Sequence, residues 1–374
     1  MKSQATVVIV GGGVMGCAAA YELSRRGVAV TVLERSVPGA EASSAAAGIL
    51  GAQVEAHHPG PLTDLGLLSR KLYPALVRDL ERASGISIGY RKCGVLKVAY
   101  ETRAVTALTR ELAWQRKANL RVEPLTAAAL SRREPALSRE LAGGVWFGED
   151  ATLEPRALLS ALRVAAERAG AAFRSGSFVK RVSLVQGRAV GVELDDGQVV
   201  PGSHVVLAAG SWTSLLDAPH AQGPRVVPAR GQIVELKTSV PLLSSVVFGP
   251  DCYLVPRADG RLLIGSTLEF VGFRRGVTAG AVAKLLGAAI RLLPALADAE
   301  LSATWSSFRP YTSDELPLLG PSATEGLLLM SGHYRNGILL APVSARIVAD
   351  CVTGKKPPID LAPFAPERRP SPML

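Results

Sequence analysis

The chain has 374 residues, of which 48% are hydrophobic and 20% are charged, and its formal net charge is +10. This composition is typical of a globular protein long enough for two substantial cores, and it excludes an intrinsically disordered chain. The basic residues are scattered rather than gathered in a run, so we expect a solvated basic surface and no nucleic-acid partner.

Cysteine spacing and hydropathy narrow the class of protein further. The cysteines are widely spaced, without a CxxC pair, at positions 17, 93, 252 and 351. We interpret them as reduced thiols of a cytoplasmic protein, and we expect neither a disulfide nor a metal site. No stretch of about 20 uninterrupted apolar residues occurs, so we expect no membrane span. The apolar N-terminus is interpreted as part of the fold rather than as a signal peptide, because glycines interrupt it.

The first predicted elements form a dinucleotide-binding motif. Residues 6–10 are predicted to be a buried strand, residues 11–16 (GGGVMG) a tight turn, and the Ala-rich residues that follow a helix. A second strand, residues 30–33, ends at Glu34, about 20 residues after the turn, which is the spacing of this motif. The whole arrangement favours a nucleotide site over a purely structural glycine turn.

Each part of the motif has a physical role. Gly11 permits the turn, Gly13 lets a diphosphate approach the backbone, and Gly16 lets the helix pack closely on the strand. Free N–H groups at the helix start bind the diphosphate. The carboxylate of Glu34 can accept hydrogen bonds from both ribose hydroxyls. The chain is therefore predicted to bind a dinucleotide.

Small residues dominate the next segment, residues 39–53, and side chains this small cannot fill a core. We expect its backbone to pack closely against a large, flat group, with an ordinary Ala-rich helix as the alternative. Helical apolar spacing then predicts an amphipathic helix over residues 64–84. Residues 90–100 are predicted to be a strand and residues 102–119 a polar helix.

The middle of the chain is predicted to alternate helix and strand. A helix begins in residues 152–156 and ends near Arg168, and short strands follow near residues 172–173, 179–185, 189–193 and 199–200. Residues 204–212 contain a buried strand that runs into a glycine turn, which suits a strand rejoining the first sheet. Residues 225–267 are predicted to form an antiparallel sheet punctuated by Pro and Gly, and residues 279–293 a helix.

A second glycine loop, within residues 331–342, leads into a helix near the end of the chain. The N-terminus of that helix supplies N–H groups and a positive dipole end. Negative charge develops at N1 and O2 of a reduced flavin, and such a helix stabilises it. A nicotinamide enzyme has no use for this loop, so FAD is predicted rather than NAD.

These motifs resemble the D-amino acid oxidase superfamily of flavoproteins, and most closely its glycine oxidase branch, which is linked to thiamine biosynthesis. The resemblance extends over residues 4–364 and rests on residues 7–16, 43–50, 153–155, 205–212 (VVLAAGSW), 252–257, 309–310 and 332–342. It implies oxidation of glycine and small N-methyl or D-amino acids to imine or 2-oxo acid, with O2 converted to H2O2. It also implies non-covalent FAD, a homo-oligomer and supply of iminoacetate to thiamine thiazole synthesis.

The predicted fold is α/β with two domains. Pieces of the nucleotide-binding fold occur at the start, middle and end of the chain, which predicts a discontinuous Rossmann-type FAD-binding domain of residues 1–88, 148–224 and 304–364. A second, α+β substrate domain built on an antiparallel sheet takes residues 89–147 and 225–303. Residues 365–374 are predicted to be a flexible tail.

The resemblance assigns site residues one by one. Those expected to bind FAD are Gly11, Gly13, Val14, Met15, Gly16, Glu34, Arg35, Ser43, Ser44, Gly48, Ile49, Leu50, Val179, Ala209, Gly210, His333, Tyr334, Arg335, Asn336, Gly337, Ile338 and Leu339. Val14 and Met15 are expected at the diphosphate, and Ser43 and Ser44 along the flavin. The substrate is expected to contact Ile49, Gly51, Tyr253, Leu268, Arg309 and Arg335, of which Tyr253, Arg309 and Arg335 are the expected catalytic residues.

Arg309 is the candidate for the substrate carboxylate. A planar guanidinium binds a carboxylate through two charge-assisted hydrogen bonds and so fixes the α-carbon. A surface salt bridge is the alternative for Arg309, and a core position is the alternative for Tyr253, whose hydroxyl would add a third contact. Arg335 could serve the flavin, the substrate or only its own loop. Hydride transfer to the flavin needs no side-chain base once the substrate amine is neutral.

Departures from the patterns of the superfamily leave other functions open. No cysteine lies near Arg309 and no lysine occurs between Lys237 and Lys284, which argues against the sarcosine oxidase branch and leaves O2 activation unassigned. Ile49 and Leu268 stand where methionines are expected, so the substrate preference is open. The alternatives are a D-proline-type D-amino acid dehydrogenase passing electrons to quinone, a flavin domain acting on a carboxymethylamino-modified tRNA base, and a nicotinamide dehydrogenase.

Overall fold

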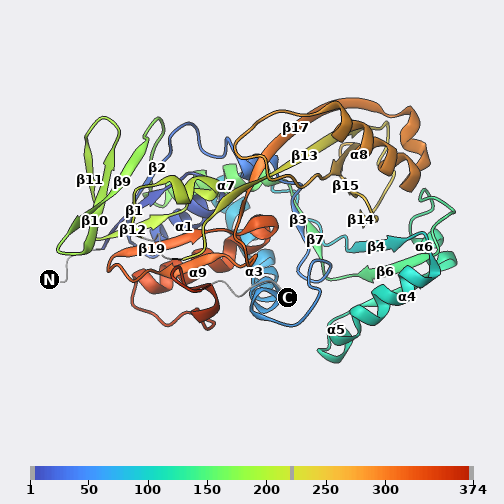
Figure 1. Ribbon diagram of the computed structural model, residues 1–374, viewed down its shortest axis with the longest axis horizontal. Coiled ribbons are helices and arrows are strands. Elements are labelled where there is room, and N and C mark those ends of the chain that lie inside the picture. Colours follow the sequence, from blue (N-terminus) through green and yellow to red (C-terminus); the bar gives the residue numbers. More distant parts are fainter. Residues whose placement is uncertain (1–4, 220–222, 370–374) are drawn as a thin grey trace.

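The structure is a computed structural model that describes residues 5–219 and 223–369. Its first sheet has six strands in the order β18 (Leu318–Pro321), β19 (Leu327–Ser331), β12 (His204–Leu207), β1 (Thr6–Val10), β2 (Ala29–Leu33) and β8 (Ala172–Arg174) (Figure 1). Neighbouring strands are parallel except β18 and β19. Because β12 pairs in parallel with β1, the prediction that this strand rejoins the first sheet is confirmed.

Two different layers cover this sheet, because alternate side chains of a strand point to opposite faces. Val7 and Ile9 pack with the helices α1 (Val14–Ser24), α3 (Pro61–Ser84), α7 (Pro155–Arg168) and α9 (Gly337–Val352). Val8 and Val10 pack with the three-stranded antiparallel sheet of β9 (Val179–Val185), β10 (Arg188–Leu194) and β11 (Val199–Pro201). The predicted nucleotide-binding α/β architecture is confirmed.

The second sheet has eight strands in the order β17 (Glu300–Tyr311), β13 (Val227–Lys237), β16 (Arg261–Gly265), β15 (Tyr253–Pro256), β14 (Val246–Phe248), β4 (Val95–Ala99), β6 (Gly143–Phe147) and β5 (Glu123–Thr126). Helix α8 (Ala279–Leu292) lies over β13 and β16, and α4 (Thr102–Glu111), α5 (Ala113–Lys117) and α6 (Ala127–Arg133) lie at the other end (Figure 1). The sheet is antiparallel as predicted except where β4 and β14 pair in parallel. These two strands come from separate excursions of the chain, so no hairpin joins them.

Several boundaries differ from the sequence-based predictions. The strand predicted over residues 90–100 begins only at Val95, since Gly94 has φ +69° and a Cβ there would lie 2.0 Å from the ring of Trp146. The helix predicted over residues 102–119 is two helices, because Leu112 leaves the helical conformation. The remaining elements are short: α2 (Ala42–Ala45), β3 (Ile49–Leu50), β7 (Ala151–Thr152) and the 3-10 helices η1 (Gly210–Leu215), η2 (Pro294–Asp298), η3 (Tyr334–Asn336) and η4 (Ala362–Phe364).

Two of the predicted domain limits fall on continuous structure. Strand β17 pairs with β13 from Glu300 to Tyr311, so a boundary after residue 303 would cut a strand, and we propose to place it after Tyr311. Residues 365–369 were predicted as part of a flexible tail, but Arg368 is held by both oxygens of Asp314 at 2.8 and 2.9 Å. Residues 370–374, the rest of that predicted tail, lie outside the described residues.

Candidate active site

One cavity of about 670 Å³ is lined by residues of both large sheets. Of the residues assigned to a site from the sequence, it is lined by Gly11, Gly13, Val14, Met15, Glu34, Arg35, Ser43, Gly48, Ile49, Gly51, Val179, Ala209, Gly210, Tyr253, Leu268, Arg309, His333, Tyr334, Arg335, Asn336, Gly337 and Ile338. The fold therefore brings almost all of the predicted residues to one place.

Four of the residues predicted to bind FAD lie behind this lining: Gly16, Ser44, Leu50 and Leu339. Leu50 and Leu339 are buried in the core beneath the helices, so their side chains are used for packing. A Cβ on Gly16 would lie 1.9 Å from the carbonyl oxygen of Gly11, so this glycine lets α1 pack on β1, which is its predicted role. For Ser44, the hydroxyl lies beside Gly39 rather than in the cavity.

The glycine turn after β1 forms one end of the cavity. Gly11 has φ +108°, a conformation that favours glycine, and a Cβ there would lie 2.5 Å from the carbonyl oxygen of Ala208. Helix α1 starts just after Gly13, and the hydroxyl of Ser43 accepts a hydrogen bond from the backbone N–H of Val14 at 2.9 Å. Ser43 therefore lies at the end where a diphosphate is expected, and its expected place along the flavin stays a prediction.

The carboxylate of Glu34 is fixed against this turn. Its Oε2 accepts a hydrogen bond from the N–H of Gly12 at 2.8 Å, and its Oε1 accepts one from the N–H of Ser36 at 2.9 Å. A carboxylate has about four acceptor sites, so two remain for the hydroxyls of a ribose. The position and the remaining acceptor capacity both fit the predicted role of Glu34.

Replacing Glu34 by alanine is expected to weaken FAD binding while sparing the turnover of FAD-saturated protein. Loss of a charged acceptor costs about 1.5–3 kcal/mol, and the carboxylate lies at the glycine turn rather than beside Arg309. The FAD dissociation constant, measured by titrating the apoprotein, checks the first expectation, and kcat at saturating FAD checks the second. An unchanged dissociation constant would contradict the assignment.

Two residues that the sequence analysis missed complete this end of the cavity. The guanidinium of Arg35 lies 3.9 Å from the ring centroid of Trp212 and forms an ion pair of 2.7 Å with Glu41. Trp212 belongs to the VVLAAGSW motif, whose last residue carried no predicted role. No pattern in the sequence marked Glu41 as a site residue, because its contact with Arg35 depends on how the loop between them folds.

Two residues of the loop before α9 line the cavity and carry buried polar atoms. Nε2 of His333 lies 3.0 Å from the hydroxyl of Ser344, whereas Nδ1 of His333 and the hydroxyl of Tyr334 have no hydrogen-bond partner within the described residues. Burial lowers the pKa of His333 to about 3, so its ring is neutral at physiological pH. Buried polar groups without partners are rare and costly, so these atoms fit the polar edge of a bound ring system. Together with the glycine turn, they fit FAD.

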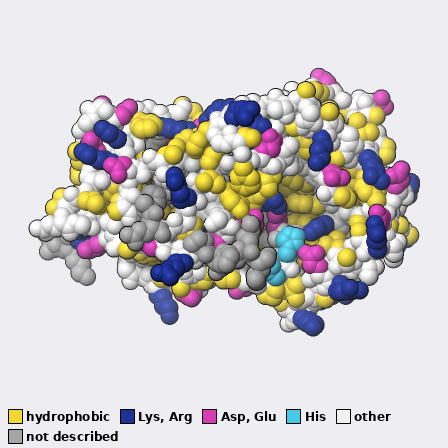
Figure 2. Space-filling model, in the orientation of Figure 1, with side chains coloured by type: hydrophobic (Ala, Val, Ile, Leu, Met, Phe, Trp, Pro, Cys, Tyr) yellow, Lys and Arg dark blue, Asp and Glu magenta, His cyan; other side chains and the backbone are white. Residues whose placement is uncertain are grey.

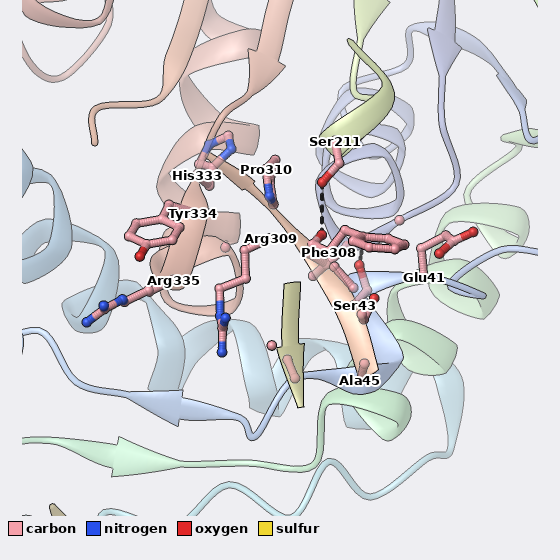
Figure 3. A pocket seen from close by; sticks show the side chains of 18 of the residues that line it. Glu41, Ser43, Ala45, Ser211, Phe308, Arg309, Pro310, His333, Tyr334 and Arg335 are labelled. Carbon is pink, nitrogen blue, oxygen red and sulfur yellow. Dashed lines mark hydrogen bonds between the residues drawn. The ribbon is translucent and has the colours of Figure 1, made fainter. Parts of the chain in front are cut away.

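Arg309 projects into the cavity from β17 (Figure 3). Its Nη1 donates a hydrogen bond to the carbonyl of Thr267 at 3.1 Å, and its Nη2 donates one to the hydroxyl of Ser266 at 2.5 Å. No carboxylate within the described residues forms an ion pair with it, so the surface salt bridge considered from the sequence is not formed. Each terminal nitrogen of the guanidinium keeps a hydrogen for a ligand.

The other two predicted catalytic residues lie in the same cavity. Tyr253, at the start of β15, packs over Gly265, where a Cβ would lie 2.2 Å from its ring and hydroxyl. Arg335 is 47% exposed and lies 3.9 Å from Glu55, which also lines the cavity. Figure 3 shows Arg309 between the loop of Tyr334 and Arg335 on one side and Phe308, Ser43 and Glu41 on the other.

Apolar groups of the eight-stranded sheet and of β3 line the cavity together with Arg309 and Tyr253. Ile49, Ile233 and Phe248 line the cavity, and the Phe248 and Tyr253 rings are tilted with centroids 5.7 Å apart. Leu268 lies at the rim with 43% of its surface exposed. The only helix in the small-residue segment of residues 39–53 is the short α2 (Ala42–Ala45). The alternative of an ordinary Ala-rich helix over this segment is therefore wrong.

Among the described residues, no group of three or more His, Cys, Asp and Glu side chains is arranged to hold a metal ion. None of the described helices combines the length and the apolar character that a bilayer span requires. The cysteines at positions 17, 93, 252 and 351 are free thiols.

Comparison with known proteins assigns the class. A family model described as FAD dependent oxidoreductase (DAO) matches residues 6–351. The chain belongs to this family of FAD-dependent oxidoreductases. The predicted membership of the D-amino acid oxidase superfamily and the predicted fold are confirmed.

Within the family the chain is similar to glycine oxidases. It is 40% identical to "Glycine oxidase" of Geobacillus kaustophilus over 98% of this chain and 97% of that protein. The crystal structure of glycine oxidase from Geobacillus kaustophilus superposes with a TM-score of 0.91 at 39% identity, covering 96% of this chain and 98% of the other. The structure of iminodiacetate oxidase from Chelativorans sp. BNC1 gives a TM-score of 0.88 at 28% identity, with 98% and 100% covered.

Other relatives are longer than this chain. "Bifunctional protein ThiO/ThiG" of Trichormus variabilis is 39% identical over 94% of this chain but only 53% of that protein. The chain spans about half the length of such bifunctional relatives.

Proposed function

We propose that this protein is an FAD-dependent amine oxidase that acts on glycine and on small N-methyl or D-amino acids. The observation that carries the proposal is the position of Arg309, which lies in the same cavity as the glycine turn and Glu34 and forms no ion pair within the described residues. A guanidinium that forms no ion pair and lies in a mostly apolar cavity is suited to a carboxylate. The similarity to glycine oxidases supports the same substrate class.

In the proposed reaction the chain binds and orients the substrate. Arg309 binds the carboxylate of the substrate, and the hydroxyl of Tyr253 adds a further contact to it. The apolar groups that line the same cavity exclude water. When bound, non-covalent FAD would accept a hydride from the α-carbon and pass the electrons to O2. Neutral His333 and the hydroxyl of Tyr334 would hydrogen-bond the polar edge of the flavin.

The biological setting is also a proposal. We propose that the imine product serves thiamine thiazole synthesis, which the similarity to relatives named ThiO/ThiG supports. A cytoplasmic location and assembly as a homo-oligomer with no nucleic-acid partner remain predictions. On the face that Figure 2 shows, Lys and Arg side chains are dispersed among acidic ones, which does not favour the tRNA-modifying alternative.

Anaerobic bleaching of the bound flavin by a panel of amines tests the proposal. Glycine, sarcosine and small D-amino acids are expected to bleach it, and O2 uptake with H2O2 formation is expected on aeration. Bleaching with reoxidation by a quinone but not by O2 would favour the D-proline-type dehydrogenase. Protein that binds no flavin, or that no amino acid bleaches, would contradict the proposal.

Activity is expected to rise from neutral to mildly alkaline pH, because hydride leaves the α-carbon readily only when the substrate amine is unprotonated. His333 contributes no inflection, since its pKa is about 3 and its ring is neutral throughout this range. The check is the pH dependence of kcat under saturating substrate from about pH 6 to 9. A flat profile would contradict the mechanism.

A further inference from the structure

Arg309 is held by a loop that a polar cluster, with two buried members and one partly exposed member, in turn fixes. Both of its hydrogen bonds end on this loop, at the hydroxyl of Ser266 and the carbonyl of Thr267. The segment leaves β16 at the cavity wall and continues to α8. The direction of the guanidinium therefore depends on where this loop sits.

The cluster behind the loop consists of Arg230, Gln232 and Glu269, none of which lines the cavity. Arg230 and Gln232 are 4% and 1% exposed. The guanidinium of Arg230 forms an ion pair with Oε2 of Glu269, and Gln232 donates a hydrogen bond to Oε1 of Glu269 at 2.7 Å. Backbone hydrogen bonds of 2.8 and 3.0 Å also join Arg230 to Glu269.

Thr267 connects this cluster to Arg309. Its hydroxyl donates to Oε1 of Glu269 at 2.6 Å and accepts from the N–H of Gln232 at 3.0 Å. The hydroxyl of Thr267 therefore donates one hydrogen bond and accepts another, and these two contacts fix the position of its peptide group. Its carbonyl is the acceptor for Arg309.

The ionised state of Glu269 suits this role. Burial alone would raise its pKa, but the hydrogen bonds from Arg230, Thr267 and Gln232 outweigh burial and hold the pKa below its ordinary value. Glu269 is therefore an anion at neutral pH. An anion binds the hydroxyl and the guanidinium more strongly than a neutral group.

We propose that Arg230, Glu269 and Thr267 are positioning residues that hold the Arg309 guanidinium in the direction needed to bind a substrate carboxylate. This inference rests on the proposed function, which supplies the identity of the substrate. The quantity that the three residues are inferred to raise is the affinity of Arg309 for any small carboxylate. The three residues act only through Arg309, so their effect disappears when Arg309 is absent.

The test uses FAD-loaded protein carrying Glu269→Gln or Thr267→Val, each alone and combined with Arg309→Ala. Thr267→Val keeps the shape of the side chain and leaves the Arg230–Glu269 ion pair in place. It therefore tests the inference even if Glu269→Gln does not fold. The readouts are kcat/KM for glycine and the dissociation constant of acetate, followed by the absorbance of bound flavin. Glu235→Gln is the matched control, because Glu235 also accepts from an arginine (Arg261, 3.2 Å) and a hydroxyl (Ser302, 2.6 Å) in the same sheet.

Each single variant is expected to weaken acetate binding and lower kcat/KM about 3- to 100-fold, the range of couplings within one hydrogen-bond network. FAD content and the Glu235→Gln control are expected to match wild type. In the Arg309→Ala background the same substitutions are expected to change either value less than about twofold. Wild-type values in both single variants, or an equal loss in the Arg309→Ala background, would overturn the inference.

The proposed function can fail separately. If no amino acid bleaches the wild-type flavin but acetate still binds, the substrate assignment is wrong and the acetate titrations alone decide the inference. If wild type binds neither glycine nor acetate, both proposals are overturned.

Discussion

Arg309→Ala is expected to lower kcat/KM for glycine by about 30- to several-thousand-fold while FAD content stays near wild type. The substrate is small, so a two-point grip on its carboxylate is a large share of the total interaction. Removing the guanidinium leaves that carboxylate unpaired in a mostly apolar cavity, at a cost of roughly 2–5 kcal/mol, and each 1.36 kcal/mol is about tenfold.

The fold should survive this substitution. The atoms that lose a partner are the hydroxyl of Ser266 and the carbonyl of Thr267, both of which line the cavity and remain within reach of water. Arg309→Lys is expected to recover only part of the activity, because an ammonium keeps the charge but not the planar fork. Steady-state kinetics with glycine, together with the FAD absorbance of each variant, make the comparison.

Two outcomes would remove the basis of the amino-acid oxidase proposal. One is an Arg309→Ala variant that keeps most of its kcat/KM for glycine. The other is equal turnover of amines that lack a carboxylate. Loss of FAD from the variant would instead indicate that Arg309 supports the cofactor.

The sequence predicted best where a motif is local. The turn at Gly11 and the acid at Glu34 follow from spacing along two strands and one helix, and the structure joins them through the N–H of Gly12. The strand ending at Leu207 was predictable as a return to the first sheet, since a wholly apolar run before a glycine turn is typical of a buried parallel strand.

Contacts between distant segments could not be predicted in this way. Buried Arg257 donates hydrogen bonds of 2.9 Å to the carbonyls of Ala47 and Leu153, and so joins the eight-stranded sheet to the nucleotide-binding part. The sequence marked Arg257 only as part of a motif. Nothing local distinguishes an arginine that binds backbone carbonyls from one that binds solvent.

The domain boundary near the start of β17 could not be predicted from the sequence either. Residues on both sides of the predicted boundary at 303/304 continue one antiparallel ladder with β13, including Arg309 opposite Ala229. An exposed edge strand carries few buried side chains, so its hydrophobic pattern is weak. The strand that positions the expected substrate-binding arginine was therefore visible only in the fold.

Gly231→Ala is expected to lower kcat/KM for glycine by up to about 100-fold without loss of FAD or of the fold. A Cβ on Gly231 would lie 2.4 Å from both terminal nitrogens of Arg309, and thus the guanidinium must move. It is the end of a flexible side chain, so it can move without disturbing the backbone. Misplacement of a binding group by about 1 Å can cost 10²-fold in rate.

Gly287→Ala in α8 is the matched control for this last substitution, because a Cβ built there meets no described atom within 4 Å beyond its chain neighbours and the adjoining backbone of its own helix. It adds the same methyl group and is expected to leave kcat/KM unchanged, with stability equal to or slightly above wild type, since alanine favours a helix over glycine. In an Arg309→Ala background Gly231→Ala is expected to have no further effect, because the group that it displaces is gone. Wild-type kinetics in Gly231→Ala, or a loss that persists without Arg309, would show that Gly231 does not act by making room for the guanidinium.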